Sequence, residues 1–315
     1  MGKFIIDIDR INKAYMRINL ALTSGIVASD AERGQMIVMD IQDSSIVGHA
    51  SLKKHEGEGG FVFRSQKVTE VNTMSLTLGN TLEFLDIRDY YGMPLRIIMP
   101  VVAYLALLER GLKPSDVITW TGGTTSVDDL FFQGHFGPLV EVTEKLMPNG
   151  VGTLNAILSR LGFLSQGGPN SLDLLQRMRV YPFQILEWIN HLAIGDGLSK
   201  VFQPKADESS SIRPSIMMLQ NVLRKSGTEL MERVEGKSQI PVSGFSFVSF
   251  PDTHFFRDIA FCGYFPSDKP KYGILIWLHK KEESKEFKDL KELERLELGL
   301  HAAHVCKTIL DFYDS

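Results

Sequence analysis

A serine followed three residues later by a lysine is the spacing in this chain with the clearest chemical meaning. On a helix the two side chains share one face, so the lysine can take the proton of a serine that attacks a carbonyl carbon. The spacing occurs once, as Ser-Leu-Lys-Lys at 51–54. Those residues end a segment that predicts a strand, where a serine and a lysine three apart point to opposite faces. We therefore do not expect Ser51 to be a nucleophile.

Other reactive residue types also lack the partners that chemistry requires. Lys-Ser-Gly at 225–227 ends a predicted helix with a glycine stop. His301 and His304 can share a face of the last helix, but two ligands without an acidic or cysteine partner do not make a metal site. Gly-Glu-Gly-Gly at 57–60 is a flexible loop without the sequence that holds phosphate. We expect no metal and no cofactor.

Two further groups are interpreted as structural. His135, Asp128 and Asp129 fall in the irregular segment 113–135, where they are expected to be loop residues, with a place beside a cleft as the alternative. Two cysteines cannot form a disulfide framework. Cys262 lies in an apolar strand and Cys306 on an apolar helix face, so both are predicted to be core residues.

Composition excludes several classes of protein. The 315 residues are 43% hydrophobic and 23% charged, with a net charge of −4, so we expect a globular chain that does not bind nucleic acid. The run at 279–297 mixes both signs, which is typical of a solvated loop and helix face. No segment is long and apolar enough to cross a membrane, and the first residues do not form a signal peptide. The protein is either cytoplasmic or targeted by a segment outside this chain.

The elements that must position any site follow from periodicity. The predicted helices cover 9–23, 95–110, 139–146, 152–162, 181–193, 214–225 and a terminal segment whose stripe runs from Leu293 to Ile309. The predicted strands cover 35–41, 45–52, 240–250, 257–265 and 272–279. Ile97 to Leu108 should form a buried helix that Gly111 ends.

This order predicts an α/β fold of the α+β type. The early hairpin and the three late strands should form one antiparallel sheet of about five strands, with the terminal helices on one face and an inserted all-helical region on the other. We expect a single domain over 1–315, in which 1–60 and 239–315 form the sheet part and 61–238 the helical part.

Five stretches in this order resemble the transpeptidase domain of penicillin-binding proteins and, more distantly, serine β-lactamases. The chain is identified as a member of this superfamily with degenerate catalytic motifs. The stretches cover almost the whole chain and are, in sequence order, 31–54, 105–123, 137–163, 240–247 and 261–278. The last of them, "FCGYFPSDKPKYGILIWL", is the most specific local match.

The resemblance implies three motifs, S-x-x-K, S-x-N and K-T-G, in which the first serine forms an acyl-enzyme and the first lysine takes its proton. This chain departs from all three. There is no serine or cysteine from 76 to 114, no S-x-N anywhere, and no lysine from 238 to 268. The positions that the motifs should occupy, which we expect to line the former active site, are Ile97, Pro100, Pro148, Asn149, Gly150, Phe245, Ser246 and Phe247.

The replacements remove every ionisable group that acyl transfer uses. We expect Ile97, Pro148 and one of Phe245 or Phe247 to converge in one cleft, and we assign no catalytic residue. Whether the two rings fill the cleft or belong to the sheet core stays open, because alternation places them on one side of a strand without saying which. Pro100 suits a first helical turn.

The resulting hypothesis is a catalytically inactive transpeptidase-like domain in bacterial peptidoglycan synthesis, acting as a scaffold for another cell-wall or envelope protein. The alternatives are an active D-Ala-D-Ala transpeptidase or carboxypeptidase with an unrecognised nucleophile, and a non-covalent sensor of peptidoglycan fragments or β-lactams. Stem peptides are the possible small ligands.

The resemblance also implies a location at the periplasmic or extracytoplasmic face of the cell membrane. Because the chain starts near the first helix of such domains, we expect the family's anchor and pedestal to lie outside it, with Met1 and Gly2 an added start. Membrane contact is then expected only through a segment absent from this chain.

Overall fold

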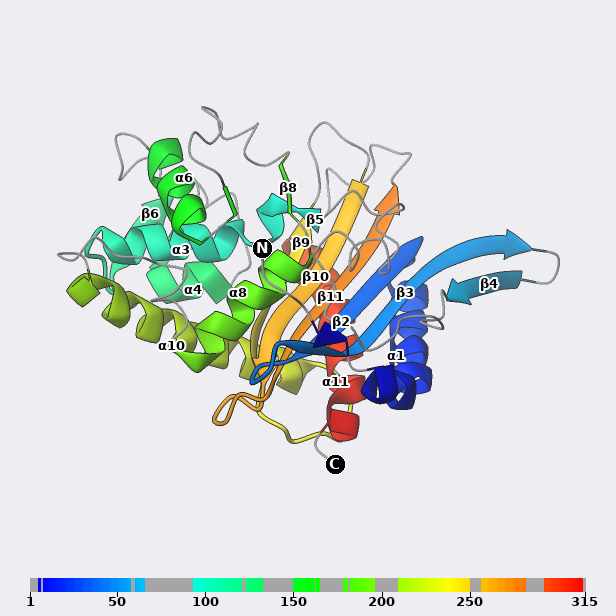
Figure 1. The fold of residues 1–315 in the computed structure, drawn as a ribbon. Helices are drawn as coiled ribbons and strands as arrows, with labels where there is room; N and C mark the ends of the chain where they lie inside the picture. Colours follow the sequence, from blue (N-terminus) through cyan, green and yellow to red (C-terminus); the bar gives the residue numbers. More distant parts are fainter. Residues whose placement is uncertain are drawn as a thin grey trace. The chain divides into compact units, whose positions relative to one another are not determined.

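A computed structural model describes residues 5–6, 8–57, 60–65, 93–120, 123–132, 150–161, 163–164, 178–180, 182–195, 209–249, 256–281 and 292–313. The chain divides into two compact units. The first is formed by Met1–Tyr91 and Gly227–Ser315 and contains the main sheet, and the second is formed by Gly92–Ser226 and is mainly helical (Figure 1). That they form a single domain stays a prediction.

The sheet of the first unit joins strands from both ends of the chain (Figure 1). Its strands are β1 (Ile5–Ile6), β2 (Arg33–Asp40), β3 (Ser45–Gly57), β4 (Gly60–Ser65), β9 (Ser243–Ser249), β10 (Phe256–Phe265) and β11 (Tyr272–Lys281). The order is β1-β3-β2-β11-β10-β9, with β4 also paired to β3, and every pair except β1–β3 is antiparallel. The predicted antiparallel sheet of five long strands is confirmed, because β11 pairs with β2 and so joins the early hairpin to the late strands.

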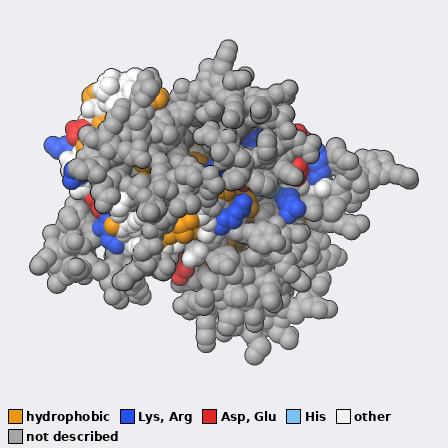
Figure 2. All heavy atoms as spheres, turned by 90° about the horizontal axis from the view of Figure 1, so that it is seen from above, with side chains coloured by type: hydrophobic (Ala, Val, Ile, Leu, Met, Phe, Trp, Pro, Cys, Tyr) orange, Lys and Arg blue, Asp and Glu red, His pale blue; other side chains and the backbone are white. Residues whose placement is uncertain are grey.

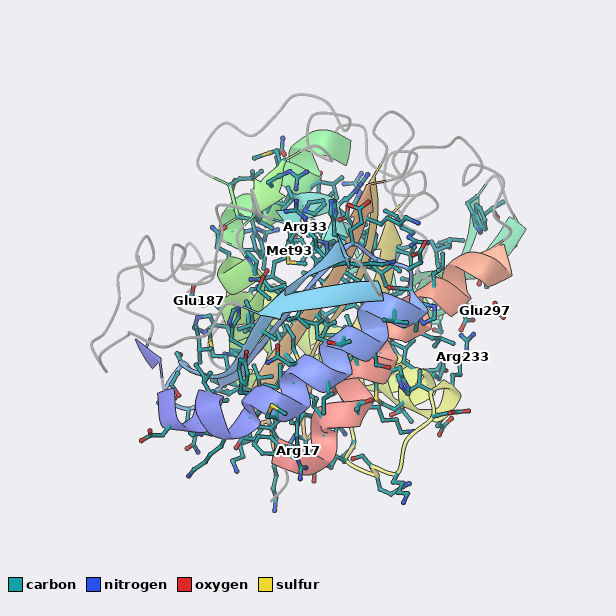
Figure 3. The ribbon with its side chains drawn as sticks, turned by 90° about the vertical axis from the view of Figure 1, so that its right-hand side faces the viewer. Arg17, Arg33, Met93, Glu187, Arg233 and Glu297 are labelled. Carbon is teal, nitrogen blue, oxygen red and sulfur yellow. The ribbon has the colours of Figure 1, made fainter. Side chains whose placement is uncertain are left out.

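Two terminal helices, α1 (Ile8–Ala28) and α11 (Glu292–Tyr313), pack on each other and on one face of this sheet (Figure 3). The apolar core between them includes Ile18, Met36, Phe261 and Ile274. α1 continues past the predicted end at residue 23, through Gly25. A Cβ atom at that glycine would lie 2.3 Å from a methyl group of Val305, so the glycine permits the close approach of α1 to α11.

The second unit is built around a fully buried helix. Its elements are β5 (Met93–Pro94), η2 (Leu95–Ile97), α3 (Met99–Glu109), β6 (Val117–Trp120), β7 (Gly123–Ser126), α4 (Val127–Phe132), α6 (Gly150–Arg160), β8 (Arg179–Val180), α8 (Pro182–Ile194) and the first part of α10 (Ser209–Arg233). Residues Met99 to Leu108 are all buried, which confirms the predicted buried helix. The predicted helix at 139–146 lies outside the described residues.

Two local predictions were wrong. Asp128 and Asp129 are in the first turn of α4, and the segment before them forms the β6–β7 hairpin. Gly227 does not end a helix, since α10 continues to Arg233. A Cβ atom at Gly227 would lie 2.2 Å from the carbonyl oxygen of Val242, so this glycine serves close packing. No helix among the described residues is long and apolar enough to cross a membrane.

Candidate functional site

The first motif position lies in a turn without a polar hydroxyl or amine. Ile97 ends the 3-10 turn η2, Ile98 precedes α3, and Pro100 is in the first turn of α3, where its missing N–H leaves no helical hydrogen bond unmade. All three side chains are buried. Because no nucleophile or base is present in this turn, it cannot supply the first step of acyl transfer.

Tyr104 carries the hydroxyl nearest to this turn along α3, and it is a structural donor. Its hydroxyl group donates a hydrogen bond of 2.6 Å to Asp128 in α4, and its ring lies 5.2 Å from that of Phe131. Burial, with a smaller contribution from Asp128, raises the pKa of Tyr104 well above its usual value. The phenol therefore stays protonated. Sequence reasoning missed this pair, because nothing in the spacing of the two residues indicates it.

The second motif position is described only in part. Pro148 and Asn149 lie outside the described residues, and Gly150 is the first residue of α6. α6 packs on α3, and the guanidinium of Arg160 pairs with Glu109 at the end of α3. Of the residues predicted for the first two motifs, Pro100 and Gly150 therefore lie on two helices that pack on each other. The predicted meeting of Ile97 with Pro148 stays a prediction.

The third motif position is on β9, at the edge of the main sheet. Ser246 donates a hydrogen bond of 3.0 Å to the carbonyl oxygen of Gly299 in α11, so its side chain points to the helix-covered face. Alternation then directs Phe245 and Phe247 to the opposite face. Both are buried, at 4% and 3% exposure, opposite Cys262 and Ala260 of β10. The hydroxyl group of Ser246 is thus hydrogen-bonded to a carbonyl oxygen of α11, and the side chains of Phe245 and Phe247 carry no charge.

A buried polar group occupies the same face of the sheet as the two phenylalanines. Asp258 accepts a hydrogen bond of 2.9 Å from the indole of Trp277, and the same carboxylate oxygen lies 2.8 Å from Nδ1 of His279. A buried carboxylate in this position fixes the orientation of an imidazole ring, as a histidine base requires. Sequence reasoning missed this group, because Asp258 and His279 meet only through the register of β10 with β11.

Two further polar residues on this face have unmade hydrogen bonds. Gln35 is buried on β2, in register with Trp277 of β11 and Ser51 of β3. Among the described residues, neither its amide nitrogen nor its amide oxygen has a hydrogen-bond partner. His49 is also buried, with Nε2 unpaired. Burial lowers the pKa of His49 to about 3, so its imidazole is neutral near pH 7.

Comparison with protein-family models and with curated protein sequences gives no match. Solved structures do match. The transpeptidase domain of the FtsI4 D,D-transpeptidase from Legionella pneumophila superposes with a TM-score of 0.52 at 17% identity, covering 94% of this chain and 95% of that one. A peptidoglycan synthetase from Bifidobacterium adolescentis gives a TM-score of 0.56 at 13% identity, covering 99% of this chain and 62% of that one.

A receptor domain matches equally well. The C-terminal domain of the Bacillus licheniformis BlaR penicillin-receptor gives a TM-score of 0.53 at 10% identity, with 99% and 98% of the two chains covered. The chain has the fold of a penicillin-binding-protein transpeptidase domain. At these identities the likeness concerns the fold, and what this transpeptidase-like chain does must be argued from its own residues.

The residues that match the family's motifs by letter do not form a transpeptidase site. Ser51 is in strand β3, and Lys54 of the same tetrapeptide pairs with Asp30 at 3.3 Å. Lys225 is inside α10, with its ammonium group 3.9 Å from Asp129. A serine and a lysine in an extended strand cannot exchange a proton as they do on a helix. The expected strand position of Ser51 is confirmed.

Histidine and cysteine residues are the remaining candidates for metal and thiol chemistry. Over the described part of the chain, no three histidine, cysteine or acidic side chains gather as a metal site would require. Burial, followed by the charges of Arg257 and His304, lowers the pKa of His301. Cys262 and Cys306 are buried as predicted, and burial raises the pKa of both thiols, so neither forms a reactive thiolate. His135 lies outside the described residues.

Charged side chains of both signs lie on the surface of the described residues. On the face that Figure 2 shows, the coloured Lys and Arg side chains form separate groups interspersed with Asp and Glu. That the chain does not bind nucleic acid stays a prediction.

Proposed function

We propose that this chain is a catalytically inactive transpeptidase-like domain that works in bacterial cell-wall synthesis by binding another envelope protein. The observation that carries the proposal is the start of α3, where Ile97 and Pro100 are buried and no serine or cysteine occurs from 76 to 114. A missing nucleophile cannot be replaced by binding groups, because they cannot form the acyl bond.

The cell-wall setting is supported by the solved structures of the same fold, which include a D,D-transpeptidase domain and a peptidoglycan synthetase. A location outside the cytoplasmic membrane is part of the same proposal. The residues predicted for the third motif support the loss of catalysis. Phe245 and Phe247 are buried and apolar, so neither offers the positive charge with which a lysine would hold a substrate carboxylate.

Covalent capture by penicillin tests the loss of catalysis, since an active-site serine keeps a β-lactam as a stable ester. We expect excess penicillin to leave the intact mass unchanged and a fluorescent penicillin to give no labelled band, beside an active transpeptidase that is labelled. An adduct on one serine, lost on prior denaturation, would overturn the proposal in favour of an active enzyme. Ser51→Ala would then be the first variant to examine.

A non-covalent sensor is the second candidate, and the likeness to the BlaR penicillin-receptor domain favours it. Calorimetric titration with stem pentapeptides and with intact β-lactam separates the two roles. A sensor binds one of these ligands without a change in protein mass, whereas the scaffold that we propose binds neither. The unpaired amide of Gln35 is the first group to substitute if binding is found.

A further inference from the structure

We draw no further inference here: the strongest candidate, the polar cluster of Asp258, His279 and Gln35 on the sheet face away from α1 and α11, belongs to the candidate site already described.

Discussion

The start of α3 and the sheet face away from α1 and α11 differ in whether they bury polar side chains. Around Ile97 and Pro100, the positions predicted for the nucleophile and base of a transpeptidase, the chain buries side chains without a hydroxyl or an amine. On the sheet face away from α1 and α11, Asp258 is buried with its hydrogen bonds made, and Gln35 is buried with none made. This fold thus tolerates buried polar groups.

This comparison shows that the stability of the fold does not by itself require the start of α3 to be apolar. A buried amide without partners costs about 1–3 kcal/mol, and the sheet bears that cost at Gln35. The same stability could accommodate a serine hydroxyl at the start of α3, where a backbone carbonyl oxygen can accept a hydrogen bond from it. That the predicted motif positions are apolar because they have no chemical role stays a prediction.

The largest expected effect comes from returning a charge to the first motif position. Pro100→Lys should lower the free energy of unfolding by about 4 kcal/mol or more, because the ammonium group would be buried among apolar side chains without a partner. Urea unfolding followed by circular dichroism measures the change. Val117→Lys, at an exposed position on β6 in the same unit, is the control and should cost less than about 0.5 kcal/mol.

A small cost for Pro100→Lys would contradict this comparison. It would mean that the start of α3 opens to water, and it would return the enzyme and sensor alternatives to consideration.

The second, intermediate effect is a loss of stability at acid pH. His49 has a pKa of about 3 in the folded protein and an ordinary value of 6.5, so below pH 6.5 the unfolded chain binds a proton that the folded protein does not. Stability contributed by neutral His49 is therefore complete above pH 6.5 and is lost as the pH falls toward 3, at about 1.4 kcal/mol per pH unit. Unfolding free energies at pH 7, 5.5 and 4.5 measure it.

His49→Met is the matched variant, since methionine has a similar volume and cannot bind a proton. Its stability should fall less steeply with acid than that of the parent chain. Parallel pH profiles for the two proteins would show that His49 reaches water in the folded state.

The smallest expected effect has the opposite sign. Gln35→Met removes an amide with no hydrogen-bond partner and keeps its volume, so stability should stay unchanged or rise by about 1 kcal/mol. Ser243→Ala is the contrast, because Ser243 donates a buried hydrogen bond of 2.9 Å to Ser267, and its loss should cost about 1 kcal/mol. A loss of more than about 2 kcal/mol on Gln35→Met would indicate a bound partner for the amide.

Much of the fold could be predicted because its signals are local. Apolar periodicity indicated the strands β2, β3, β10 and β11 and the buried α3, and turn residues separated them. The prediction that Gly227 ends a helix was wrong, because α10 continues beyond it. The glycine instead allows close packing against Val242. Sequence spacing cannot distinguish these two uses, since both need a residue without a side chain.

The candidate site was predicted less completely. Residue types alone placed no nucleophile at Ile97, but the pairing of Tyr104 with Asp128 and the group around Asp258 depend on contacts between elements. The convergence of Ile97, Pro148 and a phenylalanine stays a prediction, as do the scaffold role and its partner.

The sequence by itself determined that no serine or cysteine occurs from 76 to 114, because this absence needs no coordinates. It also determined that Phe245 and Phe247 share one side of a strand, since alternation has a period of two. Only the tertiary structure decided which side. Ser246 donates its hydrogen bond to Gly299, 53 residues away, and that contact turns both rings from α11 toward the face that holds Asp258. A long-range hydrogen bond of this kind has no signature in local sequence.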